Sequence, residues 1–66
     1  MNHKLYVARR EKRLKQKDVA QKIGIHPVTY QHKESGKTEF TMGEAKLLCK
    51  IFGCTLDDLF WEEAKE

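Results

Sequence analysis

Apolar residues recur along the chain at intervals of three and four, the spacing that places side chains on one face of an α-helix. Leu5 and Ala8 share one such face, and Val19, Ala20 and Ile23 share another. No stretch alternates apolar and polar residues well enough to predict a β-strand. The pattern therefore predicts five helices, over residues 3–13, 16–23, 27–34, 42–52 and 56–64.

Glycine, proline and capping residues mark the ends of these predicted helices. Gly24 suits the position just after a helix, and Pro27 suits the first position of the next. Thr41 and Glu44 have the spacing of a capping box. We expect an all-α fold, a compact five-helix bundle with short connections, in a single domain over residues 1–66.

The size and composition of the chain disfavour an enzyme. A chain of 66 residues leaves little room for a deep catalytic cleft. The sequence has no Ser/His/Asp or Cys/His constellation, no phosphate-binding glycine loop and no clustered carboxylates with a pocket to hold them. It also lacks an apolar run of about 18 residues and the apolar core of a signal peptide. We expect a cytoplasmic, non-enzymatic protein.

Charge is distributed unevenly along the sequence. Residues 1–38 carry ten Lys or Arg against three Asp or Glu, a net +7, whereas residues 39–66 carry three against seven, a net −4. Together they give the net +3 of the chain. The basic half would attract a polyanion, although charge asymmetry alone slightly favours a merely solvated surface.

The cysteines and histidines predict neither a disulfide framework nor a metal site. Cys49 and Cys54 do not form a CxxC motif, and they suit small positions in the core. Their spacing from His26 and His32 matches no common zinc pattern. We expect no metal, no cofactor and no small-molecule ligand, and we place His26 at a helix N-cap.

The segment QKDVAQKIGIHPVTYQHKESGK, residues 16–37, predicts a helix-turn-helix unit. The small Ala20 allows the next helix to approach closely, and Gly24 allows a tight reversal. In the second helix of the unit, Tyr30 is expected to be buried.

Over about residues 5–60 the sequence resembles the lambda-repressor-like, or Cro/repressor-type, helix-turn-helix family, also called the xenobiotic-response-element class. The matching pieces are LYVARREKRLKQKDVAQKIGI, TYQHKESGK and EAKLLCKIFGCTLDDLF, and the run GCTLDDLF resembles the closing signature of the family. The resemblance implies a transcriptional regulator that binds double-stranded DNA sequence-specifically, and a repressor rather than an activator.

The resemblance also implies a role for individual residues. The positions that face base edges in the major groove are Pro27, Val28, Gln31 and His32. Val28 can contact a thymine methyl, Gln31 can pair with adenine, and His32 can donate to guanine or reach a phosphate. Pro27 departs from the family pattern, because it offers apolar contact and rigidity but no side-chain hydrogen bond. Lys33 departs from it as well, at a position where the family often has an aliphatic or aromatic residue, so its stem is expected to pack against the protein and its amine to extend to water.

Other positions are implied to hold the protein on the DNA or to hold the fold together. The residues expected to contact the DNA backbone are Gln16, Lys17, Thr29 and Lys37. Arg9 and Glu34 match a pair that forms an internal salt bridge between the first and third helices.

The family resemblance further implies a homodimer on a two-fold operator. The recognisable pattern ends near residue 60, so the dimer is expected to form through the helical domain itself, with Trp61, Leu56 and Ile51 as candidates for the interface. Trp61 could instead pack as a lid on the core. The alternative function is an antitoxin or adaptor-type protein-interaction module on the same fold, for which the acidic C-terminal half would matter most.

Overall fold

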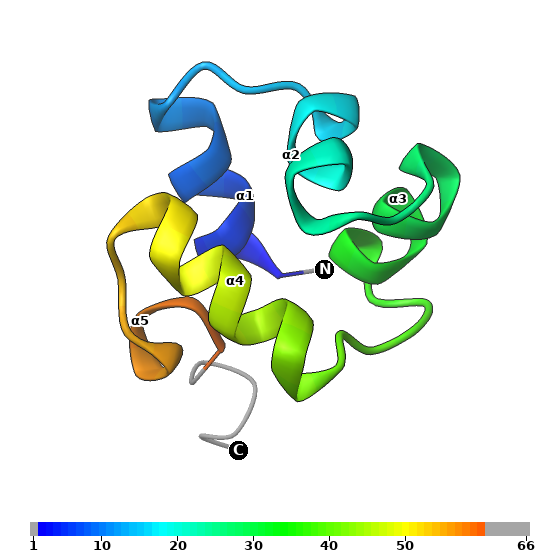
Figure 1. Cartoon of the computed structure of the whole chain (residues 1–66). Coiled ribbons are helices and arrows are strands. Elements are labelled where there is room, and N and C mark those ends of the chain that lie inside the picture. Colours follow the sequence, from blue (N-terminus) through cyan, green and yellow to red (C-terminus); the bar gives the residue numbers. More distant parts are fainter. Residues whose placement is uncertain (1, 61–66) are drawn as a thin grey trace.

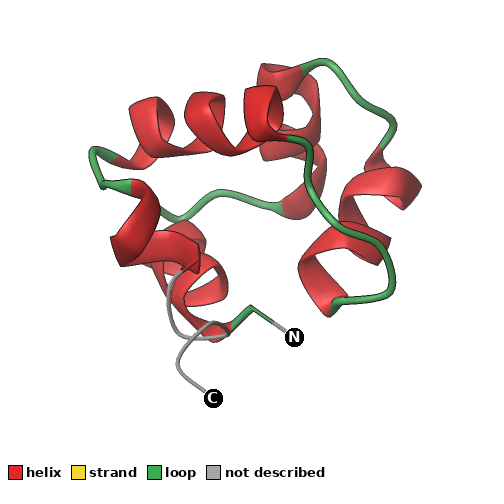
Figure 2. Ribbon diagram, turned by 90° about the horizontal axis from the view of Figure 1, so that it is seen from below, coloured by secondary structure: helices red, strands yellow, loops and turns green. Residues whose placement is uncertain are grey.

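The computed structural model describes residues 2–60, which form five α-helices and no strand within that range. The helices are α1 (His3–Glu11), α2 (Gln16–Ile23), α3 (Pro27–Ser35), α4 (Met42–Phe52) and α5 (Leu56–Phe60). Figure 1 shows α2 and α3 side by side, and short loops join the successive helices (Figure 2). The predicted all-α fold with five helices is confirmed.

The predicted end of the first helix was wrong. Helix α1 ends at Glu11, two residues before the expected end, because Arg13 takes a left-handed backbone conformation with φ of 58°. The Leu14 N–H then donates to the Arg9 carbonyl, and the Arg13 N–H donates to the Arg10 carbonyl. These two bonds form a Schellman motif, which ordinarily places glycine at the left-handed position.

The other predicted helices agree with the structure where it describes them. Helix α3 extends one residue beyond the predicted end, and α2 and α4 have the expected bounds. The predicted capping box of α4 is confirmed, since the Thr41 hydroxyl accepts from the Glu44 N–H and the Glu44 carboxylate accepts from the Thr41 N–H. The last part of the predicted fifth helix, 61–64, lies outside the described residues.

One apolar core joins all five helices. Its buried members are Leu5, Val19, Ala20, Ile23, Tyr30, Leu48, Phe52 and Leu59. Ala20 is completely buried, and α2 contacts both α3 and α4. Helix α5 contacts α1 and α4 and so closes the bundle on the side away from α3. Cys49 and Cys54 are free, half-buried thiols that pack against this core.

Candidate nucleic-acid interface

The turn between α2 and α3 consists of three residues, 24–26, and each stabilises it in a different way. Gly24 has a φ of 79°, which a residue with a Cβ adopts only with strain. Ile25 is half-buried against the core. His26 is the N-cap of α3, as expected, and its Nδ1 accepts from the Val28 N–H at 3.1 Å. Pro27 follows at the first helical position, so the start of α3 is fixed in both backbone angle and hydrogen bonding.

The outer face of α3 carries the residues that were expected to read bases. Val28, Gln31 and His32 are exposed, and their spacing of three and four residues places them on one helical face. Within residues 2–60, no hydrogen bond engages the Gln31 amide or the His32 imidazole. Pro27 is also exposed, beside Val28. The structure therefore presents two polar and two apolar side chains of this helix to solvent.

The inner face of α3 is held by a buried carboxylate. Glu34 is 2% exposed, and its two oxygens accept four hydrogen bonds. Arg9 donates to both oxygens, from Nε at 2.9 Å and from a terminal nitrogen at 3.2 Å. Gln16 Nε2 donates at 2.7 Å, and the Tyr30 hydroxyl donates at 3.0 Å. Glu34 thus joins α1, the start of α2 and α3 at one point.

The electrostatics of this cluster follow from burial and pairing. Burial alone would lower the pKa of Arg9, but the hydrogen bonds and negative charge of Glu34 outweigh it and raise that pKa. The pKa of Tyr30 is raised far above its ordinary value, mainly by burial and secondly by the negative charge of Glu34. Both shifts favour a charged Arg9 and a protonated Tyr30 in the folded protein.

Gln16 and Tyr30 were not expected in this cluster. The resemblance assigned Gln16 a contact with a DNA phosphate, whereas in the structure its amide nitrogen is directed at Glu34. Its backbone N–H, at the start of α2, remains compatible with an anion. Tyr30 lies four residues before Glu34 on the same helix, so helical spacing could have revealed that pair.

A second ion pair joins α3 to α4. Lys33 Nζ lies 2.7 Å from Oε1 of Glu44, and it also lies 5.9 Å from the centre of the Phe40 ring. Lys33 was expected to extend its amine to water, and that expectation was wrong, because Glu44 offers a partner across the helix interface. Burial would raise the pKa of Glu44, but hydrogen bonds from Lys33 and Thr41 outweigh it and lower that pKa.

The remaining candidates for contact with the DNA backbone lie at element boundaries. Lys17 is in the first turn of α2, and Thr29 is in the first turn of α3. Lys37 follows Gly36, whose φ of 94° turns the chain away from the end of α3. All three side chains are exposed.

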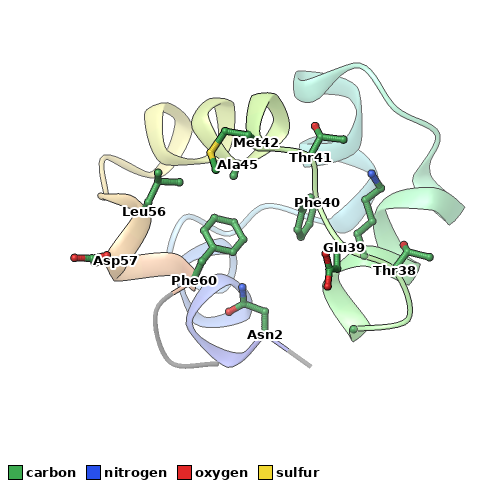
Figure 3. A pocket seen from close by; sticks show the side chains of 12 residues that line it. Asn2, Thr38, Glu39, Phe40, Thr41, Met42, Ala45, Leu56, Asp57 and Phe60 are labelled. Carbon is green, nitrogen blue, oxygen red and sulfur yellow. The ribbon is translucent and has the colours of Figure 1, made fainter. Parts of the chain in front are cut away.

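The expected interface residues differ in their surroundings. Leu56 is 37% exposed and borders a surface hollow of about 610 Å³. Figure 3 shows Phe60 in this hollow between Leu56 and Phe40, with Met42 nearby. Met42 is 61% exposed and was missed by the sequence analysis. Ile51 instead packs partly against the core, and Trp61 lies outside the described residues.

Residues 2–60 contain neither a membrane-spanning helix nor a cluster of metal-binding side chains. No helix there has the length and apolarity required to cross a membrane. No three or more His, Cys, Asp or Glu side chains of this part of the chain gather in a way that could hold a metal ion.

The tight α2–α3 reversal and the exposed outer face of α3 define a helix-turn-helix unit, the class in which the second helix enters the major groove. A model of the helix-turn-helix family matches residues 5–59. The chain belongs to this family, in its Cro/repressor-type branch, whose members are DNA-binding transcription regulators. No curated protein and no solved structure matches the chain significantly.

Proposed function

We propose that the chain is a sequence-specific transcriptional repressor that reads double-stranded DNA with α3 in the major groove. The observation that carries this proposal is the contrast between the two faces of α3. Its inner face is locked by Glu34, whereas Val28, Gln31 and His32 are exposed on its outer face. The choice of repression over activation rests on family analogy alone.

The exposed side chains suit different base edges. Val28 offers methyl groups to the C5-methyl of thymine, and the Gln31 amide can pair with N6 and N7 of adenine. His32 can donate to N7 or O6 of guanine. A bidentate pair contributes roughly 1–3 kcal/mol of discrimination, so Gln31 is the expected main source of specificity. Pro27 would add apolar contact at the start of the helix.

Backbone contacts would set the position of α3 in the groove. Lys17, Thr29 and Lys37 are exposed and can each reach a phosphate without reading sequence. Gln16 would contribute through its backbone N–H, because its side-chain amide nitrogen is directed at Glu34.

Selection of bound duplexes from a random DNA library tests this proposal. We expect a defined consensus, with two half-sites about one helical turn apart if the protein binds as a dimer. Equal recovery of all sequences would refute sequence-specific reading. If a stoichiometric protein partner displaced the DNA from α3, the antitoxin or adaptor role would be favoured instead.

We further propose that the protein binds its operator as a homodimer through the hollow bordered by Leu56. Leu56 and Met42 expose apolar side chains there, and Trp61 is the next residue after Phe60, which lies in the same hollow. Ile51 would have a minor part, because it packs partly against the core.

Sedimentation at micromolar concentration tests the dimer. We expect a dimeric species that Leu56→Ala and Trp61→Ala weaken, and Lys46→Gln on α4 serves as a surface control. A species of 7.8 kDa with and without operator would refute the homodimer.

A further inference from the structure

Four helices, α1 to α4, end in a turn in which the residue after the left-handed position donates its N–H to the carbonyl five residues back, but one of the four has no glycine at the left-handed position. Helices α2, α3 and α4 place Gly24, Gly36 and Gly53 at the left-handed position. Helix α1 places Arg13 there, with φ of 58°, and it is the one non-glycine residue with positive φ among residues 2–60. The left-handed conformation disfavours any residue with a Cβ, so arginine is a poor choice for this turn on backbone grounds.

Arg13 borders a basic surface hollow of about 620 Å³ between the end of α1 and the start of α2. We call it the α1–α2 hollow, and its lining residues are Arg9, Arg10, Arg13, Leu14, Lys15 and Gln16. Arg10, Arg13 and Lys15 are all exposed. The hollow therefore gathers three solvent-accessible cations on six consecutive positions of the chain.

Contacts among residues 2–60 leave the charges of these three residues without a carboxylate partner. The ion pairs among residues 2–60 are Arg9–Glu34 and Lys33–Glu44, so Arg9 is the one cation of the hollow with a carboxylate partner. The Asp18 carboxylate accepts from the backbone N–H of Lys15, not from its amine. Glu11 borders a different hollow, beside Leu59.

Other contacts hold two of the arginines that line the hollow, Arg9 and Arg10. Arg9 donates a third hydrogen bond, at 2.9 Å, to the carbonyl of Leu14 and so fixes the loop after α1. The guanidinium of Arg10 lies 5.7 Å from the centre of the Tyr6 ring and donates to its hydroxyl at 3.3 Å. A side chain that is already held in place loses less conformational entropy when it binds an anion.

We propose that the α1–α2 hollow binds a phosphate of the DNA backbone, with Arg13 as its main cation, beside the region contacted by the α2–α3 unit. This inference rests on the proposed DNA-binding function. Gln16 connects the two surfaces, because it lines the hollow and also bonds to Glu34 of α3. In Figure 1 the loop that carries Arg13 leads directly from the end of α1 to the start of α2. Because the Arg13 guanidinium has no carboxylate partner among residues 2–60, phosphate binding accounts for arginine at a position that the backbone would give to glycine.

A phosphate contact makes a measurable contribution to the salt dependence of the affinity for DNA. Each contact with duplex DNA adds about 0.9 to the slope of log affinity against log salt concentration. The factor by which losing one contact weakens binding should therefore be about eightfold larger at 0.1 M salt than at 1 M salt, on every DNA sequence.

The test compares Arg13→Gly, Arg13→Lys and the control Lys46→Gln by fluorescence anisotropy over a range of salt concentrations. The probes are a mixed-sequence duplex and the best duplex selected from random DNA. Arg13→Gly removes a charge while relieving the turn, so its unfolding midpoint should equal or exceed that of the wild type. Its affinity should nevertheless fall by the same factor on both duplexes, with a slope reduced by about 0.9. Arg13→Lys should retain the wild-type slope.

Lys46→Gln removes one charge from an exposed site on α4 and should change the slope less than Arg13→Gly. If Arg13→Gly has the slope of the wild type, the inference about the hollow is overturned. If the wild type in the same experiment prefers its selected duplex, the proposed function still stands. A loss of slope equal to that of Lys46→Gln would also overturn the inference, because net charge alone would explain the effect. A wild type that binds neither duplex would refute the proposed function, and this inference with it.

Discussion

Replacing Tyr30 with phenylalanine tests whether the Glu34 cluster stabilises the fold. The change deletes one hydroxyl that donates to Oε2 of Glu34 at 3.0 Å, and the ring of Tyr30 stays in the core. A hydrogen bond to a charged group contributes about 1.5–3 kcal/mol. Oε2 keeps its bond from Arg9 at 2.9 Å, so the lower figure applies. We expect Tyr30→Phe to lower the free energy of unfolding by about 1.5 kcal/mol.

Thermal and urea unfolding, followed by circular dichroism, measure this effect. For a domain of this size, about 1.5 kcal/mol corresponds to a fall in Tm of about 6–12 °C. Tyr6→Phe is a matched control, because the Tyr6 hydroxyl meets Arg10 at the exposed surface at 3.3 Å. We expect that control to change the stability by less than about 0.5 kcal/mol. Equal stabilities for the two variants would refute the reasoning.

The same pair of variants gives a second readout at high pH. The pKa of Tyr30 is raised in the folded state above its ordinary value of 10.0, so the unfolded chain loses this proton first. The contribution of Tyr30 to stability is therefore complete below pH 10.0 and is lost as the pH rises beyond it. The difference between wild type and Tyr30→Phe should narrow above that pH. A constant difference would contradict the assigned burial of the hydroxyl.

Three other predictions follow from the contacts of α3. Glu44→Gln should reduce the loss of stability in acid, which a plot of Tm against pH would measure. The lowered pKa of Glu44 gives the wild type a contribution to stability that is present above pH 4.5 and is lost as the pH falls through the pKa of Glu44 in the folded state. His26→Ala should lower stability by about 0.5–2 kcal/mol, and His26→Asn should restore most of it, as thermal unfolding would show. Gln31→Ala should weaken the selected duplex more than mixed-sequence DNA in anisotropy titrations, whereas Lys37→Ala should weaken both alike.

The sequence was sufficient to predict the helices whose ends are marked by glycine or by caps. Helices α2 and α4 have an apolar stripe followed by Gly24 and Gly53, and both were found with their observed bounds. The end of α1 was missed because its turn has the same hydrogen bonds as the turn that ends α2 but places Arg13, not glycine, at the left-handed position. Glycine and proline mark most helix ends in a sequence, but neither marks a turn in which a charged residue takes the left-handed conformation.

Contacts between elements were harder to predict than the elements themselves. Arg9 and Glu34 are 25 residues apart, and only the family resemblance suggested that they would meet. Lys33 and Glu44 lie on different helices, so their pairing depends on how α3 and α4 pack. The exposure of Val28, Gln31 and His32 was predictable, because the periodicity of α3 leaves them no apolar neighbours on the same face.

The way α3 is held explains how its outer face can differ from one sequence to another without loss of the fold. Tyr30 is the one apolar residue of α3 that is buried. A single buried side chain removes too little apolar area from water to fix the orientation of the helix. The orientation is set instead by directional contacts, namely the four hydrogen bonds to Glu34 and the ion pair of Lys33 with Glu44. None of these contacts uses a side chain of the outer face. Changes at Val28, Gln31 or His32 should therefore alter which bases are read while the position of α3 stays the same.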